Sequence, residues 1–285
     1  MPTCHLDNRA LFQLQGPEAE HFLQNVITND LSALKDGECR PSALLTPQGK
    51  ILFDFLVSRA GSETLRIECR TDIAADLVKR LTLYKLRAKV DISEIEQRTI
   101  AVSWQSDSAS SEKDSTLTDC RFPADLNVRR HYGETPEADS TRELWDELRI
   151  ANAVAESGND FALGDAFPHD VLYDQNGGIG LKKGCFVGQE VVSRMHHRGT
   201  ARRRLLITES DSDLPPPGTE LRADGKPLGT LGTVSGPKGL AIVRIDRVKD
   251  AMDTGTPVLA GDTAVTFAIP QWASFTFPES TESAG

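Results

Sequence analysis

The densest chemical signal in the sequence is a glycine-rich segment that holds a single cysteine. Residues 177–190 read GGIGLKKGCFVGQE, which places Cys185 just after a pair of lysines. The pattern that follows predicts a helix beginning at Gly188 and ending at Gly199, with its apolar side chains facing inward. A thiol near a helix N-terminus and beside lysines is favoured as a thiolate, so Cys185 is our candidate reactive group. The alternative is a small buried thiol in a tight turn.

Two rival interpretations of this segment invoke different chemistry. A phosphate-binding loop is suggested by GGIGLKKG, but the spacing GxxxxGK followed by Ser or Thr is absent. A Cys–His catalytic pair is the second rival, with His169, His196 or His197 as the base. Because His196 and His197 are adjacent, they face different sides of a helix, and we expect one exposed and one packed histidine without joint metal ligation.

A basic cluster lies immediately downstream, on a chain that is acidic as a whole. The formal net charge is −10, from 32 Lys+Arg and 42 Asp+Glu, which argues against a dedicated nucleic-acid binder. A local cluster of arginines in such a chain suits an anionic small molecule or an acidic partner, whereas the alternative is a solvated charged face. The cluster consists of Arg194, Arg198, Arg202, Arg203 and Arg204.

The elements that position these groups begin with a strand over residues 10–14. A helix is expected after Gly16 and Pro17, with an apolar stripe over Phe22, Leu23, Val26 and Ile27. A turn at 46–50 leads into a strand over 51–58. Asp72 is then expected to cap a helix whose apolar residues recur every four positions, at Ile73, Leu77 and Leu81.

The pattern of the sequence changes near residue 200, where short β-rich runs separated by turns begin. Residues 105–119 are polar and are predicted to form an exposed loop, and a helix is predicted from about residue 140 with Trp145 near its apolar stripe. After residue 200, short strands and Gly/Pro-rich turns indicate an antiparallel barrel or sandwich of about 80 residues. The final residues, PESTESAG, are predicted to be a frayed tail.

The cysteine pattern and the N-terminal segment indicate the cellular compartment of the protein. The five cysteines are widely spaced and contain no CxxC pair, so we expect reduced thiols in the cytoplasm and no resident metal. The opening residues lack the pattern of a signal or transit peptide, and no apolar run approaches the roughly 18 residues of a membrane helix. We therefore expect neither a membrane nor a nucleic acid as a direct partner.

The whole pattern resembles the folate-binding YgfZ proteins, which are relatives of the glycine-cleavage T-protein, an aminomethyltransferase. Lys183 to Glu190 matches the KGC[YF]xGQE signature of that family. GDAFPHD, followed by DQNGGIGLKKGCFVGQEVVSRM, looks most like the bacterial branch close to the mitochondrial iron–sulfur assembly factor. Further segments match in the family's order, and they are FLQNVITNDL (22–31), LLTPQGKILFDFLV (44–57), YKLRAKV (84–90) and RGTARRRL (198–205).

This resemblance implies a fold and a role. The implied fold is a three-lobed, ring-like α+β fold, with two intertwined α/β lobes in residues 1–200 that form the folate-binding region. Residues 201–285 would form a C-terminal antiparallel β-barrel with the frayed tail. The implied role is that of a tetrahydrofolate-dependent accessory factor for assembling or repairing iron–sulfur clusters. The implied partners are a reduced folate, iron–sulfur assembly proteins and iron–sulfur client enzymes, including a radical tRNA-modifying enzyme.

The resemblance also assigns site residues. Cys185 matches the family's required cysteine, and Lys183 is its close neighbour in the signature. Trp145 aligns with a tryptophan associated with folate in a relative, and Asp170 stands where the T-protein has a carboxylate for the pterin edge. On chemical grounds Trp145 could stack, Asp170 could accept from the pterin and Arg194 could meet the tail carboxylates. The alternatives are an ordinary core tryptophan for Trp145 and a capping or turn residue for Asp170.

One departure from the T-protein separates two functions. Where the T-protein has two consecutive acids in a strand, this chain has Phe53 followed by Asp54. The loss of one acid argues against aminomethyl transfer, although Asp54 keeps a folate-dependent one-carbon transferase open as an alternative and remains a candidate catalytic residue. For Asp54, a structural polar contact is equally open. A third hypothesis is a non-catalytic scaffold that uses residues 198–204 to dock a cluster-assembly protein.

Overall fold

A computed structural model describes residues 1–96, 99–105, 115–133, 135–199 and 201–278, and the chain divides into two compact units. The first unit contains Met1–Arg142 and Asn176–Ser193. The second contains Glu143–Gln175 and Arg194–Gly285. The chain therefore passes between the units three times, and residues 143–175 pack with the C-terminal region. The last crossing lies close to the predicted boundary near residue 200.

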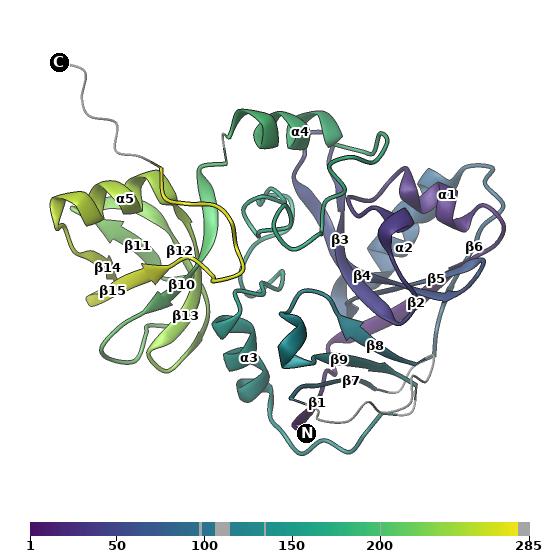
Figure 1. Ribbon diagram of the computed structural model, residues 1–285, viewed down its shortest axis with the longest axis horizontal. Helices are drawn as coiled ribbons and strands as arrows, with labels where there is room; N and C mark the ends of the chain where they lie inside the picture. Colours follow the sequence, from purple (N-terminus) through teal and green to yellow (C-terminus); the bar gives the residue numbers. More distant parts are fainter. Residues whose placement is uncertain (97–98, 106–114, 134, 200, 279–285) are drawn as a thin grey trace. The chain divides into compact units, whose positions relative to one another are not determined.

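The first unit is built on a mixed sheet, shown in Figure 1, whose order is β1-β7-β9-β8-β3-β4-β5-β2-β6. Neighbouring strands are antiparallel except for β3 and β8, which run parallel. The bounds are β1 Thr3–His5, β2 Arg9–Gln15, β3 Glu38–Leu45, β4 Ile51–Gly61, β5 Thr64–Arg70, β6 Asp91–Glu94, β7 Ile100–Ser103, β8 Thr116–Asp119 and β9 Arg129–Tyr132. The predicted strands over 10–14 and 51–58 are confirmed as β2 and β4.

Two α-helices of this unit, α1 (Ala19–Gln24) and α2 (Thr71–Lys85), pack against β5. Short 3₁₀ turns lie at η1 (Leu31–Ala33) and η2 (Ala124–Leu126). The buried stripe of α2 is confirmed at Ile73, Leu77 and Leu81. The predicted cap is wrong, because Asp72 lies inside the first turn and its carboxylate accepts a 2.9 Å bond from Arg70 Nε.

The apolar stripe predicted for the first helix is longer than the helix itself. Helix α1 ends at Gln24, so Val26 and Ile27 lie beyond it. Ile27 instead forms an antiparallel bridge with Leu44 of β3. The chain leaves the helix here because Thr28 bonds back to the sheet, its backbone N–H donating to the carbonyl of Ala43 at 2.9 Å.

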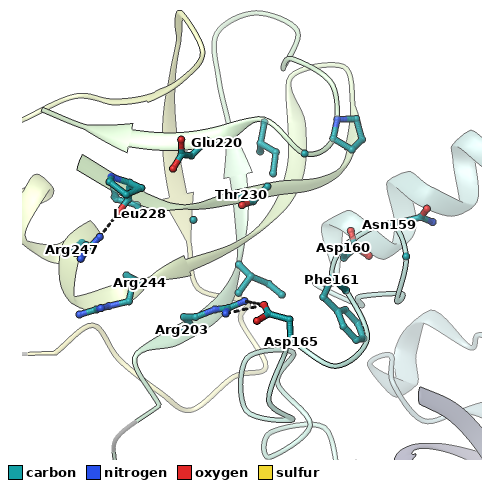
Figure 2. Close-up of a pocket in the computed structure, with 18 residues that line it drawn as sticks. Asn159, Asp160, Phe161, Asp165, Arg203, Glu220, Leu228, Thr230, Arg244 and Arg247 are labelled. Carbon is teal, nitrogen blue, oxygen red and sulfur yellow. Dashed lines mark hydrogen bonds and ion pairs between the residues drawn. The ribbon is translucent and has the colours of Figure 1, made fainter. Parts of the chain in front are cut away.

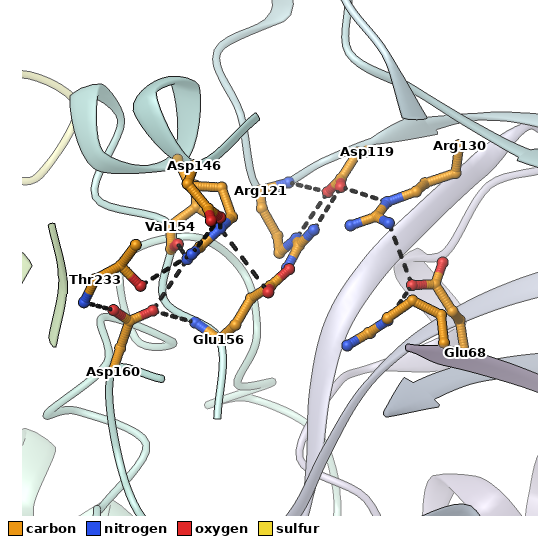
Figure 3. Close-up of polar contacts among 11 residues, drawn as sticks. Glu68, Asp119, Arg121, Arg130, Asp146, Val154, Glu156, Asp160 and Thr233 are labelled. Atoms are coloured by element: carbon orange, nitrogen blue, oxygen red, sulfur yellow. Dashed lines mark hydrogen bonds and ion pairs between the residues drawn. The ribbon is translucent and has the colours of Figure 1, made fainter. Parts of the chain in front are cut away.

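The polar segment 105–119 is not a loop throughout. Residues 106–114 lie outside the described part of the chain, but Thr116–Asp119 forms strand β8 with Leu117 and Asp119 buried. Asp119 pairs with Arg121 at 2.7 Å and with Arg130 at 3.1 Å (Figure 3). Composition concealed this strand because its charged residue is compensated by arginines rather than by water.

The second unit contains a closed antiparallel barrel in the order β10-β13-β12-β11-β14-β15. This confirms the predicted C-terminal barrel and the α+β class. Leucine, valine and alanine side chains fill the barrel, and helix α5 contributes Ile245, Val248 and Ala251 to the same core. The bounds are β10 Arg203–Glu209, β11 Glu220–Ala223, β12 Lys226–Ser235, β13 Lys238–Arg244, α5 Ile245–Thr254, β14 Val258–Ala260 and β15 Thr263–Ala268.

Residues 143–175 belong to this unit because a buried arginine ties them to the barrel. Arg149 of α3 (Arg142–Ala151) is fully buried and pairs with Asp146 at 2.8 Å and Asp160 at 3.0 Å (Figure 3). Its guanidinium also donates to Oγ1 of Thr233 on β12 at 3.0 Å. Asp160 accepts from the Thr233 backbone N–H at 2.8 Å, so the helix, the following loop and the barrel share one polar network.

The predicted helix beyond the glycine-rich segment is confirmed as α4, Gln189–Arg198. Val192 is buried, and Gly199 follows the helix with a positive φ of 59°, as a C-terminal glycine does. In the described part of the chain, no helix is long and apolar enough to cross a membrane. All five cysteines are free thiols.

Candidate functional site

The glycine-rich segment is anchored to the first unit by buried hydrogen bonds from the chain that follows α1. Thr28 Oγ1 donates to the carbonyl of Gly178 at 2.7 Å, and Asn29 Nδ2 donates to that of Gly177 at 2.8 Å. The backbone N–H of Gly180 donates in turn to the carbonyl of Thr28 at 2.8 Å. These hydrogen bonds between residues 28–29 and residues 177–180 therefore fix the loop that precedes Cys185.

Lys183 adds a charged group to these anchors. Its buried ammonium donates to the carbonyls of Ile27 at 2.7 Å and Asn29 at 2.8 Å, and it lies 5.1 Å from the centre of the Phe186 ring. Burial lowers the pKa of Lys183 to about 8, against the opposing effect of Asp30. Its ammonium is thus engaged with backbone oxygens and the aromatic ring.

Two glycines permit this close packing. A Cβ on Gly180 would lie 2.7 Å from Cβ of Asp30. A Cβ on Gly188, whose φ is +79°, would lie 2.7 Å from the carbonyl oxygen of Thr46. Only glycine fits such approaches without displacing the backbone, so these two residues set the path of the loop that presents Cys185.

Cys185 differs from the other cysteines because it is exposed. Cys4, Cys39 and Cys69 are buried, and burial raises the pKa of Cys69 to about 12. Cys120 is half-buried, and burial raises its pKa to about 11. The thiol that the sequence singled out is therefore the accessible one, on a loop whose neighbours are fixed.

Asp54 also lies in the first unit, on β4, where it stands opposite Ala43 of β3. It is half-buried, whereas Phe53 beside it is buried and projects to the other face of the strand. The phenylalanine that replaces an acid is thus a core residue. The catalytic roles of Asp54 and Cys185 stay predictions.

Asp170 lies in the second unit and is almost fully buried. Its Oδ2 accepts the backbone N–H of Phe167 at 3.0 Å and lies 3.6 Å from Nε of Arg203. Burial raises the pKa of Asp170 to about 6, although the Phe167 N–H and the guanidinium of Arg203 oppose this. The carboxylate therefore shapes a turn, and its proposed contact with a pterin remains to be tested.

The other two folate candidates of this unit differ in exposure. Trp145 on α3 has 0% of its surface exposed, so its ring packs in the interior. Arg194 on α4 is exposed. Their roles as folate contacts, like that of Lys183, stay predictions.

The arginine cluster that the sequence indicated is partly neutralised. Arg203 pairs with Asp165 at 3.1 Å, and Arg204 pairs with Asp174 at 2.7 Å. Arg198 and Arg202 remain exposed. The expected basic surface is therefore smaller than five guanidinium groups, because carboxylates distant in sequence fold against two of them.

The sequence analysis missed a group of polar residues in the second unit. One ligand-type atom from each of His169, Asp174 and His196 lies within 4.8 Å of the other two. Burial lowers the pKa of His169 to about 4, which keeps its ring neutral. A cavity of about 250 Å³ is lined by these residues together with Met195 and Phe275. His196 follows Asp174 by 22 residues and His169 by 27, so the sequence gave no local signal of the group.

A larger pocket of about 740 Å³ lies between the loop at 158–165 and the barrel of the same unit (Figure 2). Three of the arginines that line it are bonded to a carboxylate or to a backbone carbonyl. Arg203 meets Asp165, Arg244 meets Asp246 at 2.8 Å, and Arg247 donates to the carbonyl of Pro227. These three arginines therefore already have partners within the second unit.

The fold defined by this sheet and barrel is that of the aminomethyltransferase T-protein. The solved glycine cleavage system aminomethyltransferase T from Bartonella henselae superposes with a TM-score of 0.72, covering 95% of this chain and 86% of that chain. Its sequence identity is 15%, so this likeness concerns the fold alone. The GCVT N-terminal domain family matches residues 4–107, and the CAF17 C-terminal beta-barrel domain family matches residues 202–275.

Similarity to particular proteins is more specific. The mitochondrial iron-sulfur cluster assembly factor IBA57 of Mus musculus is 28% identical, covering 95% of this chain and 85% of its own length. The human protein of the same name is 27% identical, with 94% and 84% covered. The IBA57 homologue of Neurospora crassa is 31% identical over 70% of this chain and 52% of its own length. These relatives are named for iron–sulfur cluster assembly.

Proposed function

We propose that this protein is a tetrahydrofolate-binding accessory factor of the YgfZ type for iron–sulfur cluster assembly or repair in the cytoplasm, and that Cys185 carries its activity. The relatives named for cluster assembly support the general role. In this proposal the partners are cluster-assembly proteins and the iron–sulfur enzymes that receive clusters, including a radical tRNA-modifying enzyme. A link to tRNA then passes through the client enzyme.

The observation that carries the proposal is the contrast between Cys185 and its loop. Lys183, Gly180 and Gly188 are packed tightly against the first unit, whereas Gly184 borders open space and Cys185 is exposed. A buried structural thiol needs no such presentation. An exposed cysteine on a fixed loop can ligate an iron atom or replace a partner's cysteine as the ligand of an iron atom, and both reactions require access from outside.

For the folate, we propose that Asp170 and Arg194 of the second unit make the polar contacts. Arg194 is exposed and suits the tail carboxylates of a folate, and Asp170 suits the donors on a pterin edge. We propose that Trp145, which is fully buried, supports the packing of the second unit around these contacts. Lys183 in turn holds the loop of the first unit, since its ammonium bonds backbone carbonyls.

Calorimetric titration with tetrahydrofolate under anaerobic conditions tests the folate part. We expect saturable binding that is weakened at least about tenfold by Arg194→Ala, because a charge-assisted bond to a carboxylate is lost. Arg198→Ala on the same helix is the matched control and should bind as the wild type does. Absence of binding at near-millimolar ligand would remove folate from the proposal while leaving Cys185 to be tested separately.

The fold keeps folate-dependent aminomethyl transfer as a second candidate, with Asp54 as its catalytic acid. Formation of methylene-tetrahydrofolate from the aminomethyl-loaded lipoyl carrier protein separates the two. We expect none, since Phe53 replaces the neighbouring acid of the T-protein strand. Turnover that Asp54→Asn abolishes would establish the transferase instead.

A further inference from the structure

Three potential metal ligands converge in the second unit, whereas Cys185 belongs to the first. His169 and Asp174 lie on the loop before residue 176, and His196 lies in the last turn of α4. The ring centres of His169 and His196 are 6.3 Å apart, and one donor atom from each of the three side chains lies within 4.8 Å of the others.

His169 is the residue that ordinary packing does not explain. It has 1% of its surface exposed, yet among the described residues neither ring nitrogen has a hydrogen-bond partner. A buried imidazole normally satisfies at least one nitrogen, because leaving a buried polar atom unpaired costs roughly 1–3 kcal/mol. The same ring lines the cavity of about 250 Å³, so a ligand bound there can supply the missing partner.

Asp174 is held in place beside this ring. Its Oδ1 accepts a 2.7 Å bond from Arg204, and its Oδ2 accepts a 2.8 Å bond from Gln175. Arg204 also donates to the carbonyl of His169 at 2.8 Å, so one guanidinium fixes both residues. An ionised carboxylate has about four lone-pair positions, and these two bonds leave positions available. Ligating carboxylates are commonly held by such outer hydrogen bonds.

The chemistry of the donors selects the ligand. Two imidazole nitrogens and one carboxylate oxygen are donors that bind borderline divalent transition ions, whereas Ca²⁺ and Mg²⁺ prefer oxygen alone. Donors bound to one such ion lie about 3–4 Å apart, given metal–ligand distances near 2.1 Å. His196 is exposed, so its side chain can rotate inward to complete the set.

We propose that His169, Asp174 and His196 bind one divalent transition-metal ion, such as Zn²⁺ or Fe²⁺, at the edge of this cavity. The ion satisfies the buried ring of His169 and keeps open positions for water or an exogenous ligand, as three-ligand sites do. The sequence predicted no resident metal, from the cysteine spacing and from the adjacency of His196 and His197. The geometry pairs His196 with His169 instead.

Titration with Zn²⁺ by calorimetry, on protein without a histidine tag, tests this site, and Co²⁺ reports the ligand set through its visible absorption. We expect one equivalent to bind, and His196→Ala to weaken the affinity at least about tenfold. His196 is exposed, so this variant should fold. His197→Ala removes the adjacent exposed histidine and is the matched control, expected to stay within about twofold of the wild type.

Three results would overturn the site. They are the absence of stoichiometric binding, equal affinity in the wild type and His196→Ala, and a loss of binding in Cys185→Ser comparable with that in His196→Ala. The last result would assign the ion to the thiol. None of these outcomes decides the role of Cys185 in cluster maintenance, because the wild type and the variants are measured without a client enzyme.

Discussion

A comparison of Cys185 with Cys120 shows how exposure affects the reactivity of a cysteine in this protein. Cys185 is exposed on the anchored loop, while Cys120 is half-buried with a pKa raised by burial to about 11. A thiol reagent should therefore modify one cysteine rapidly in the native protein, since only the thiolate reacts. Reaction with Ellman's reagent should release one fast equivalent, which Cys185→Ser removes and Cys120→Ser leaves.

The result that contradicts this assignment is a fast equivalent that persists in Cys185→Ser. It would mean that another cysteine is the accessible thiol, and exposure would then no longer distinguish Cys185. A denatured sample of each variant should release all remaining thiols, which confirms that slow cysteines are protected by the fold.

Lys183 supplies a second test of the loop. Lys183→Met keeps the length of the side chain but removes the donors to Ile27 and Asn29, leaving two buried carbonyls without this partner. We expect unfolding in urea to cost about 1–3 kcal/mol less than for the wild type. Lys182→Met, at the exposed neighbouring position, is the control and should change stability by less than about 0.5 kcal/mol. Equal stability of the two variants would show that the anchor is dispensable.

At the scale of elements, the sequence predicted periodic structure well and buried polar networks poorly. Helix α4 and the stripe of α2 follow from local spacing. The pairing of Arg149 with Thr233 does not, because these residues are 84 positions apart and an isolated arginine is normally exposed. The same reason concealed β8, whose buried Asp119 looks like part of a polar loop, and the proximity of His169 to His196.

The Arg149 network should hold α3 and its loop to the barrel. Arg149→Met removes a buried charge and leaves Asp160 without its 3.0 Å partner, so we expect a loss of about 3–5 kcal/mol in the free energy of unfolding. The control is Ser235→Ala, which removes an exposed 3.1 Å bond from β12 to Glu147 of α3. Its loss should stay below about 1 kcal/mol, and comparable losses in chemical denaturation would refute the special role of Arg149.

The buried carboxylate of Asp119 on β8 should make the stability of the protein depend on pH. Burial opposes its ionisation, but the guanidiniums of Arg121 and Arg130 lower the pKa of Asp119 to about 2, below the ordinary unfolded value near 3.9. Between these two pKa values the unfolded state therefore binds more protons than the folded state. The stability that ionised Asp119 contributes above about pH 4 is lost as the pH falls toward 2. Its size is roughly 2–3 kcal/mol.

Urea denaturation of the wild type and Asp119→Asn across this range measures the effect. The wild type should lose stability more steeply than the variant between about pH 4 and 2, since the amide does not titrate. Identical slopes would show that Asp119 does not supply the acid sensitivity, whatever the absolute stability of the variant.

On the scale of the whole molecule, the candidate functional residues are distributed over both units. Cys185, Lys183 and Asp54 belong to the first, and Asp170, Trp145, Arg194 and the proposed metal ligands belong to the second. The net charge of −10 applies to the chain as a whole, while the arginines after α4 are partly neutralised by Asp165 and Asp174. If the protein is only a docking scaffold, its basic contacts must come mainly from Arg198 and Arg202.

Charge reversal separates that scaffold from a thiol-dependent factor. Arg198→Glu with Arg202→Glu changes exposed residues outside the ion pairs described above, so the fold should persist. We expect the double variant to keep the set of cluster-assembly proteins recovered by pull-down. Loss of that set, with unchanged thermal stability, would favour the scaffold hypothesis.

The most direct test of the central claim is rescue of an iron–sulfur enzyme in a strain that lacks this protein. Aconitase activity should be restored by the wild type and by Cys120→Ala, which removes a half-buried thiol of the same unit. Cys185→Ala, expressed to the same level, should leave the activity at that of the deletion strain. Full rescue by Cys185→Ala would contradict the account.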